Sequence, residues 1–326
     1  MSISPVEQLF EVFNESAGIL QQERSYTFLE ALGDTGENLF NGAIQQKGLS
    51  ELGMNRLKKI YAEVNLEHFS KEEIRKAYQL AILKGMKENV QPHHQMTPDA
   101  VGMLLGYLVG KFVKQPAFRI LDPAVGTGNL LTTVLNQLPN SQIESIGVEI
   151  DDVLIKLAYV NANMQEHPTH LFNQDSLEQL FIDPVDVVIG DLPVGYYPND
   201  IRAQDFQLHA EKGHSFAHHL FIEQSVRYTK PGGYLFFIVP NNLFESEQAP
   251  ALHEYIKDNL FIQGFLQLPL SIFKNKNAAK SILIVQKKGE GIRAPKEALL
   301  VQLPSLSSAA EMKKILAQID NWFREK

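Results

Sequence analysis

The sequence contains no cysteine among its 326 residues. This absence excludes a disulfide framework, a catalytic thiolate and a cysteine-ligated zinc site, and it makes a cytoplasmic location the simplest expectation. Long hydrophobic runs are missing too, since no apolar stretch reaches the roughly 18 residues that a membrane-spanning helix needs. The N-terminus has no basic start followed by an apolar segment, so no secretory signal is expected.

Basic residues are outnumbered by acidic ones, 30 to 38, which gives a formal net charge of -8. This balance argues against a wholly basic nucleic-acid binder, although a local basic groove can still contact phosphates. Hydrophobic residues make up 44% of the chain, an ordinary share for a globular protein. A chain of this length can form one large domain or two modest ones.

The first part of the chain has the character of a small helical domain. Ser4 and Glu7 fit a capping box around Pro5, and Ser70 with Glu73 repeats this signature. Apolar residues follow each start at helical spacing: Val6, Leu9, Phe10, Phe13 and Ala17, then Ile74, Ala77, Tyr78, Ala81, Ile82 and Met86. Such stripes indicate burial, so we predict a helical N-terminal domain over residues 1–94.

From residue 95 onward, short β-rich runs alternate with helical patterns. The runs are FRILD, IESIGVEI, THLFN, VDVVIGD, GGYLFFIVP, FIQGFLQLP and KSILIVQKK. This alternation is typical of βαβ units, so we expect an α/β fold with a Rossmann-like, mostly parallel sheet over residues 95–290. The last run is the best candidate for one antiparallel strand, because an irregular segment rather than a helix precedes it.

Residues 291–326 are predicted to form a C-terminal strand and helix extension. Ser308 and Glu311 fit a further capping box. The stripe of the helix that follows is Met312, Ile315, Leu316, Ile319, Trp322 and Phe323. Two alternatives stay open for this helix, docking on its own domain or contacting a second copy in a homodimer.

The segment ILDPAVGTGNLL, from Ile120 to Leu131, joins a predicted strand to a predicted helix. Gly126 and Gly128 allow close approach of the backbone to a ligand, and the new helix presents free N–H groups. A dinucleotide-binding site begins in the same way, but no glycine occupies position 131 and Asp122 would repel a pyrophosphate. A cationic ligand that carries an amino acid suits Asp122 better.

These residues resemble the motifs of class I S-adenosylmethionine (SAM)-dependent methyltransferases. The closest resemblance is to the N6-adenine DNA methylases of type I restriction-modification systems, whose DPacGtG loop is similar to Asp122–Gly128. Further similar segments follow the family's order, with Thr97 in QMTPDAVGMLLGYLV, Glu149 in IGVEID and Asp175 in FNQDSL. With its flanking helices, the chain resembles the uncharacterised bacterial YtxK group of methyltransferase-like proteins.

The resemblance implies that SAM binds along the carboxyl edge of the sheet and that no metal ion is required. It places Thr97 near the methionyl end, Glu149 on the ribose hydroxyls and Asp175 on the adenine amine, with Ser176 or Leu177 beside the ring. The other cofactor-binding residues that it implies are Asp122, Ala124, Gly126, Thr127, Gly128, Asn129, Ile150 and Asp191.

The segment GDLPV, Gly190–Val194, stands where the family has Asn, Asp or Ser, then two prolines and an aromatic residue. The resemblance implies that the Asp191 side chain and the Leu192 carbonyl accept hydrogen bonds from the amine to be methylated. With Pro193, these are the predicted catalytic residues. The predicted function is a SAM-dependent N-methyltransferase, with adenine N6 in DNA favoured over RNA or a protein amide.

Val194 departs from the family pattern, because it cannot stack on a base as an aromatic ring does. Tyr196 and Tyr197 follow closely, and one of them is a candidate to take its place as a substrate-binding residue. The same departure supports a second hypothesis. In it, the protein is a SAM-binding pseudoenzyme or scaffold with a degenerate acceptor site.

Two further groups of residues allow either a structural or a functional interpretation. His209, His214, His218 and His219 lack the carboxylate spacing of a metal motif, so packing or substrate contact is favoured over a metal site. The basic groups Lys274, Lys276 and Lys280, and Arg56, Lys58 and Lys59, are typical of a solvated face, with nucleic-acid contact as the alternative. The residues after the sheet are too few for a target-recognition domain, so action on DNA or RNA calls for a separate specificity partner.

Overall fold

The computed structural model describes residues 3–88, 96–139 and 141–325, so the predicted boundary at 94/95 lies outside the described residues. The helices are α1 (Pro5–Arg24), α2 (Phe28–Asn41), α3 (Glu51–Ala62), α4 (Lys71–Glu88), α5 (Asp99–Phe112), α6 (Asn129–Asn136), α7 (Asp152–Met164), α8 (Asp200–Ala203), α9 (Ala217–Arg227), α10 (Ala249–Asn259) and α11 (Ala309–Glu325). The strands are β1 (Ala117–Asp122), β2 (Gln142–Glu149), β3 (Thr169–Asn173), β4 (Val185–Asp191), β5 (Thr229–Pro240), β6 (Leu260–Gln267), β7 (Lys280–Lys287) and β8 (Leu299–Gln302).

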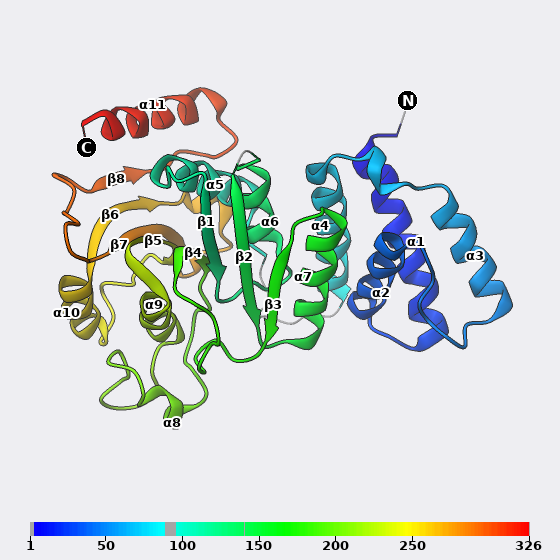
Figure 1. Ribbon diagram of the computed structural model, residues 1–326, viewed down its shortest axis with the longest axis horizontal. Helices are drawn as coiled ribbons and strands as arrows, with labels where there is room; N and C mark the ends of the chain where they lie inside the picture. Colours follow the sequence, from blue (N-terminus) through cyan, green and yellow to red (C-terminus); the bar gives the residue numbers. More distant parts are fainter. Residues whose placement is uncertain (1–2, 89–95, 140, 326) are drawn as a thin grey trace. The chain divides into compact units, whose positions relative to one another are not determined.

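The strands form one mixed, 8-stranded sheet in the order β3-β2-β1-β4-β5-β7-β6-β8. Strands β1, β4 and β5 run parallel, whereas β7 runs antiparallel to both β5 and β6 (Figure 1). Val187, Val188 and Ile189 of β4 are fully buried, as expected for a strand that is covered on both faces. The predicted α/β class, with a mostly parallel Rossmann-like sheet, an antiparallel strand and N-terminal helices, is confirmed.

The chain divides into two compact units. The first unit comprises Met1–Asp99, Val125–Pro139 and Gly147–Gln174, and the second comprises Ala100–Ala124, Asn140–Ile146 and Asp175–Lys326. Helices α6 and α7 and strand β3 therefore group with the N-terminal helices, so these units do not follow the boundaries drawn from sequence character. The predicted domains 1–94, 95–290 and 291–326 stay predictions.

The core of the first unit is built from the predicted apolar stripes of α1 and α4, together with side chains of α7. Within this core the rings of Phe13 and Tyr78 meet edge to face, with their centroids 5.1 Å apart. The capping boxes predicted at the starts of α1 and α4 are present, because Ser4 exchanges hydrogen bonds with Glu7, and Ser70 does so with Glu73. Capping and periodicity thus predicted these helices correctly.

In the second unit, the terminal helix α11 packs on α5. The ring centroids of Phe112 and Phe323 are 4.8 Å apart, and Lys111 Nζ lies 2.5 Å from Asp320 Oδ1. The Trp322 indole N–H donates a hydrogen bond to the carbonyl of Glu297 at 3.0 Å. Of the two alternatives for this helix, the structure shows docking within the chain.

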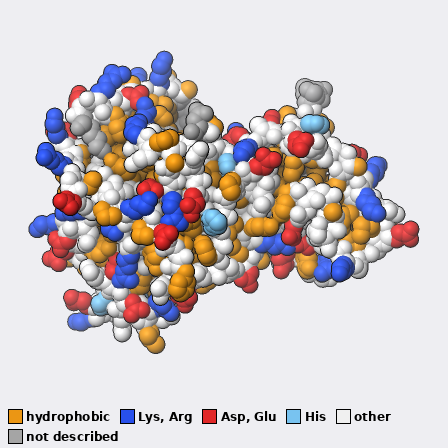
Figure 2. Space-filling view, in the orientation of Figure 1, with side chains coloured by type: hydrophobic (Ala, Val, Ile, Leu, Met, Phe, Trp, Pro, Cys, Tyr) orange, Lys and Arg blue, Asp and Glu red, His pale blue; other side chains and the backbone are white. Residues whose placement is uncertain are grey.

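Charged side chains of both signs are interspersed over the face of the molecule in Figure 2. The net charge of -8 is therefore spread, rather than gathered into one acidic area, on the face in view. Within the described ranges, no helix combines the length and the apolar character needed to cross a membrane.

Candidate active site

The glycine pair of the predicted cofactor loop lies in the first unit, at the start of α6. Gly126 and Gly128 have φ values of +54° and +75°, in the left-handed region that favours glycine. At Gly128 a Cβ would also come within 3.2 Å of Ala158 on α7, so glycine serves both conformation and packing. At Gly126 a Cβ would meet no described atom within 4 Å, which leaves space beside the loop for a ligand. Between them Thr127 is buried, and its carbonyl accepts a hydrogen bond from Asn161.

Glu149 ends β2 in the same unit, where backbone N–H groups hold its carboxylate. Oε2 accepts a hydrogen bond from Gly126 N at 3.1 Å, and Oε1 accepts one each from Ile150 N and Asp151 N at 3.0 Å. A carboxylate offers about four acceptor positions, so capacity remains for a further donor such as a ribose hydroxyl. The structure thus brings Gly126 and Glu149 together. The Ile150 side chain is exposed and Thr97 is buried.

A buried arginine that no sequence motif identifies supports the cofactor loop. Arg75 on α4 donates from Nη1 to Asn129 Oδ1 at 2.8 Å and to Asp99 Oδ1 at 2.9 Å. Its Nη2 donates to Glu72 Oε1 at 2.7 Å. Burial lowers the pKa of Arg75, but hydrogen bonds and charges from Glu72 and Asp99 raise it above its ordinary value, so the guanidinium stays charged. The sequence signal was a basic residue next to Ile74 within an apolar stripe.

Two further acids predicted to bind the cofactor lie in the second unit. Asp122 ends β1 and is buried, and its Oδ1 accepts a hydrogen bond from Ala124 N at 3.1 Å. Asp175 accepts a hydrogen bond from the Tyr197 hydroxyl at 2.5 Å. Burial, followed by this bond to Asp175, raises the pKa of Tyr197, so the hydroxyl remains a donor at neutral pH. The buried Ser176 hydroxyl donates to a carbonyl of the cofactor loop.

The predicted acceptor motif follows β4 in the second unit. Asp191 Oδ1 lies 2.5 Å from Lys280 Nζ at the start of β7, and the two side chains are 18% and 21% exposed. Leu192 is buried, and its N–H donates to a carbonyl of β5 at 3.2 Å. Pro193 and Val194 are exposed. The motif therefore presents a partly exposed carboxylate that is already paired with an ammonium, so the solvated-face reading was wrong for Lys280.

An aromatic stack follows the motif. Tyr196 is 58% exposed, and its ring stacks on Phe216 with centroids 5.0 Å apart and planes inclined by 10°. An isolated antiparallel β-bridge joins the same two residues, and Phe216 stacks in turn on His218. Of the two tyrosines predicted as substitutes for an aromatic at Val194, Tyr196 has the exposed ring, whereas Tyr197 is buried against Asp175. No sequence motif identifies Phe216.

Two adjacent histidines at the start of α9 are buried and neutral. His218 Nδ1 and His219 Nε2 find no hydrogen-bond partner among the described residues. Burial, followed by the charges of His219 and Lys280, lowers the pKa of His218 to about 3, and burial lowers that of His219 to about 4. His214 pairs instead with Asp200 at 2.9 Å. Within the described part of the chain, no group of three or more His, Asp or Glu side chains could hold a metal ion.

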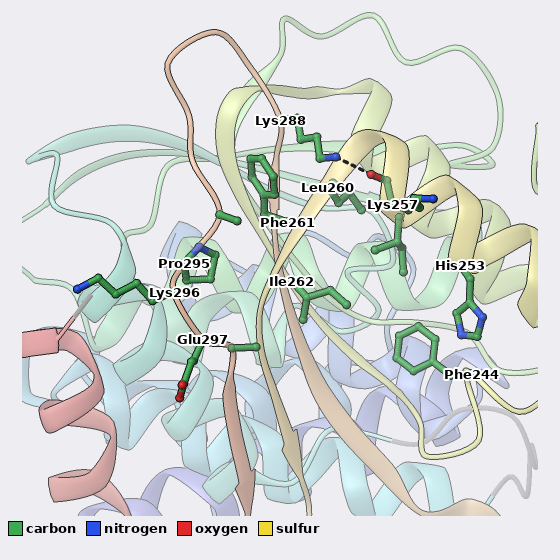
Figure 3. Close-up of a pocket in the computed structure, with 13 residues that line it drawn as sticks. Phe244, His253, Lys257, Leu260, Phe261, Ile262, Lys288, Pro295, Lys296 and Glu297 are labelled. Carbon is green, nitrogen blue, oxygen red and sulfur yellow. Dashed lines mark hydrogen bonds between the residues drawn. The ribbon is translucent and has the colours of Figure 1, made fainter.

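A separate pocket of about 410 Å³ lies in the second unit, beside α10 and the start of β6 (Figure 3). Phe244 stacks on His253 at one end of it, and Lys288 Nζ donates to the Lys257 carbonyl at the other. Its lining includes none of the residues predicted to bind the cofactor or the acceptor. This pocket is therefore distinct from the candidate active site.

Comparison with known proteins supports the motifs. A family model described as N-6 DNA Methylase matches residues 75–321, and one described as YtxK N-terminal helical domain matches residues 7–86. The chain is 51% identical over 322 residues to the uncharacterized protein YtxK of Bacillus subtilis (strain 168), covering 98% of each chain.

Solved structures show the same relationship. A Listeria monocytogenes protein assigned to the class I SAM-dependent methyltransferases matches with a TM-score of 0.91 and 49% identity, over 98% of this chain and 99% of that one. The methyltransferase subunit of a type I restriction-modification system from Streptococcus thermophilus shares the fold, with a TM-score of 0.67 and 18% identity over 98% and 75% of the two chains. These matches confirm the resemblance that the motifs indicate.

Proposed function

Because the chain belongs to the N-6 DNA methylase family, we propose that it methylates N6 of adenine in DNA. Family membership and the Listeria relative make it a SAM-dependent N-methyltransferase, and the adenine base is the finer part of the proposal. When bound, SAM supplies an activated methyl group. The amine nitrogen would form a bond to the methyl carbon, the electrons of the broken carbon–sulfur bond would stay on sulfur, and the amine would lose a proton to water. The protein then contributes mainly position.

The residues of the cofactor loop fit this ligand. The backbone at Gly126 is unobstructed, which suits a ligand beside the loop, and the Glu149 carboxylate retains acceptor capacity for a ribose hydroxyl. Asp122 is suited to the cationic end of the ligand, and Asp175 is suited to its adenine amine. The other residues proposed to contact SAM are Thr97, Ala124, Thr127, Gly128, Asn129, Ile150, Ser176 and Asp191.

Asp191 is proposed to orient the target amine. Its carboxylate and the Leu192 carbonyl, in the turn that continues through Pro193, accept hydrogen bonds from the amino group. These bonds draw the nitrogen lone pair out of conjugation with the ring. Tyr196 is proposed to stack on the base in place of Val194, because its ring is exposed and supported by Phe216.

The observation that carries the proposal is the partly exposed carboxylate of Asp191 at the carboxyl end of β4. Transfer of labelled methyl from SAM to unmethylated DNA tests it. Asp191→Ala should lower transfer at least about 10-fold, the value of a hydrogen bond to a charged group. Asp191→Asn keeps an acceptor oxygen and should retain more transfer than Asp191→Ala. Equal transfer by Asp191→Ala and wild type would refute this assignment.

A SAM-binding protein without transfer is the second candidate. It is favoured by the ion pair that already engages Asp191 and by the aliphatic side chain of Val194. Thermal stabilisation by SAM without label transfer to DNA, RNA or protein of a fractionated lysate would establish it. Label in RNA or in a protein amide would instead identify that molecule as the methyl acceptor.

A partner is proposed to supply the choice of DNA sequence, because the Streptococcus thermophilus relative is a subunit of a restriction-modification system. Transfer by the isolated chain should therefore show little sequence preference. Mapping of methylated positions on plasmid DNA measures this directly, and one strongly preferred sequence would contradict the need for a partner.

A further inference from the structure

The Lys280 ammonium and the Asp191 carboxylate form a compact pair at one edge of the sheet. Asp191 is in register with Ile238 of β5, and Lys280 is in register with Pro240 of the same strand. The sheet thus carries both side chains to one place, although they are 89 residues apart in sequence. Nζ and Oδ1 are 2.5 Å apart, and both side chains remain partly exposed.

An aromatic stack begins at Tyr196, five residues after Asp191, and ends on His218. His218, whose pKa Lys280 helps to lower, is buried and neutral at pH 7. Phe216 stacks on His218, and the exposed Tyr196 stacks on Phe216. A flat, uncharged ligand group suits such a surface, and the ion pair offers it polar contacts.

A carboxylate beside an ammonium presents one acceptor and one donor side by side. The complementary ligand edge carries a donor beside an acceptor, as the N6 amino group and N1 of adenine do. We propose that Lys280 donates a hydrogen bond to N1 of the target adenine while Asp191 accepts one from N6. This inference rests on the proposed function and names the residue that reads the ring nitrogen beside the amine.

Lys280 is then a specificity-determining residue of the acceptor site. An aliphatic ammonium, such as a lysine side chain, meets like charge at Lys280 and is rejected. Guanine presents an N1–H donor where Lys280 needs an acceptor, and it is rejected as well. A site built to hydrogen-bond its ligand discriminates strongly in this way, because the wrong ligand leaves polar groups unpaired.

Adenine analogues that lack one ring nitrogen test this role. Each oligonucleotide carries a single acceptor base, adenine, 1-deazaadenine or 7-deazaadenine, opposite an abasic site so that base pairing does not differ. Labelled-methyl transfer from SAM is measured for the wild type, for Lys280→Met and for the matched control Lys313→Met, which removes an exposed charge of α11.

Replacing adenine by 1-deazaadenine should lower wild-type transfer by on the order of 10- to 100-fold, the value of a hydrogen bond from a charged donor. Lys280→Met should lower transfer to adenine by a similar factor, and its transfer to 1-deazaadenine should be no lower than its transfer to adenine. The Lys313→Met variant and the 7-deaza base should behave as the wild type does on adenine. The same non-additivity should appear in oligonucleotide dissociation constants, measured by fluorescence anisotropy with S-adenosylhomocysteine present.

The inference is overturned if Lys280→Met methylates adenine as the wild type does, or if removal of N1 costs both proteins the same factor. Dependence on N7 in place of N1 overturns it as well. If the melting temperature of Lys280→Met differs from that of the wild type, Lys280→Arg is used in its place. Transfer by Lys280→Arg should still fall when N1 is removed. If the wild type transfers methyl to none of these bases, the proposed function is contradicted, and so is the inference that rests on it.

Discussion

The cofactor loop and the acceptor motif are held in opposite ways. In the loop, Gly128 lies against α7 and Asn129 bonds to the fully buried Arg75. In the acceptor motif, a partly exposed ion pair holds Asp191, and Val194 is 55% exposed. The fold therefore fixes the glycine loop of the proposed SAM site, whereas a few replaceable side chains define the proposed acceptor site.

The largest expected effect is on the free energy of unfolding, and it tests the buried arginine behind the cofactor loop. Arg75→Met should lower the free energy of unfolding by about 3 kcal/mol, because it leaves Glu72 and Asp99 without their shared counter-charge. Lys280→Met should cost less, about 1–2 kcal/mol, because both members of its pair retain some exposure to water whereas Arg75 is fully buried. Urea unfolding of the two variants measures the difference, and equal costs would break the comparison.

The next effect concerns the cofactor alone. Glu149→Gln should weaken SAM binding by on the order of 10-fold, because its amide NH2 would face a backbone N–H of the loop and its single oxygen would leave less acceptor capacity for the ribose. Titration calorimetry measures the dissociation constant, with the exposed Glu63→Gln of the same unit as control. SAM affinity that is unaffected by Glu149→Gln would remove this residue from the proposed site.

A change at the acceptor side should leave SAM binding intact. Tyr196→Ala should raise the barrier to transfer by about 1–3 kcal/mol, the value of stacking a base on an aromatic ring. Tyr196→Phe keeps the ring and should transfer at nearly the wild-type rate. Phe181→Ala removes another exposed ring of the second unit and serves as control. If the two Tyr196 variants transfer equally, stacking on this ring is not used.

The acceptor side also contributes to the sensitivity of the chain to acid. The pKa of His218 is lowered to about 3 in the folded chain, so the unfolded chain binds its proton first as the pH falls below about 6.5. The stability linked to this neutral ring is complete above pH 6.5, and it is lost toward acid at no more than about 1.4 kcal/mol per pH unit. His218→Phe should flatten the fall in unfolding free energy between pH 7 and about 5. Parallel slopes in wild type and His218→Phe would contradict the lowered pKa.

The cofactor loop could be predicted from the sequence, whereas the ion pair of the acceptor motif could not. The glycines at 126 and 128 and the acids at the strand ends are local signals, because turn conformation and strand termination depend on neighbouring residues. The Lys280–Asp191 pair depends on β7 lying antiparallel beside β5, which no local pattern specifies. Arg75 was hidden for a similar reason, since its bond to Asn129 links residues 54 positions apart.

The most direct test of the central claim identifies the product. DNA is incubated with the protein and isotopically labelled SAM, then digested to nucleosides for mass spectrometry. We predict label in N6-methyldeoxyadenosine with the wild type, and its loss in Asp191→Ala while SAM still stabilises that variant against heat. Label on another nucleoside, no label in DNA, or equal label from Asp191→Ala would contradict the claim.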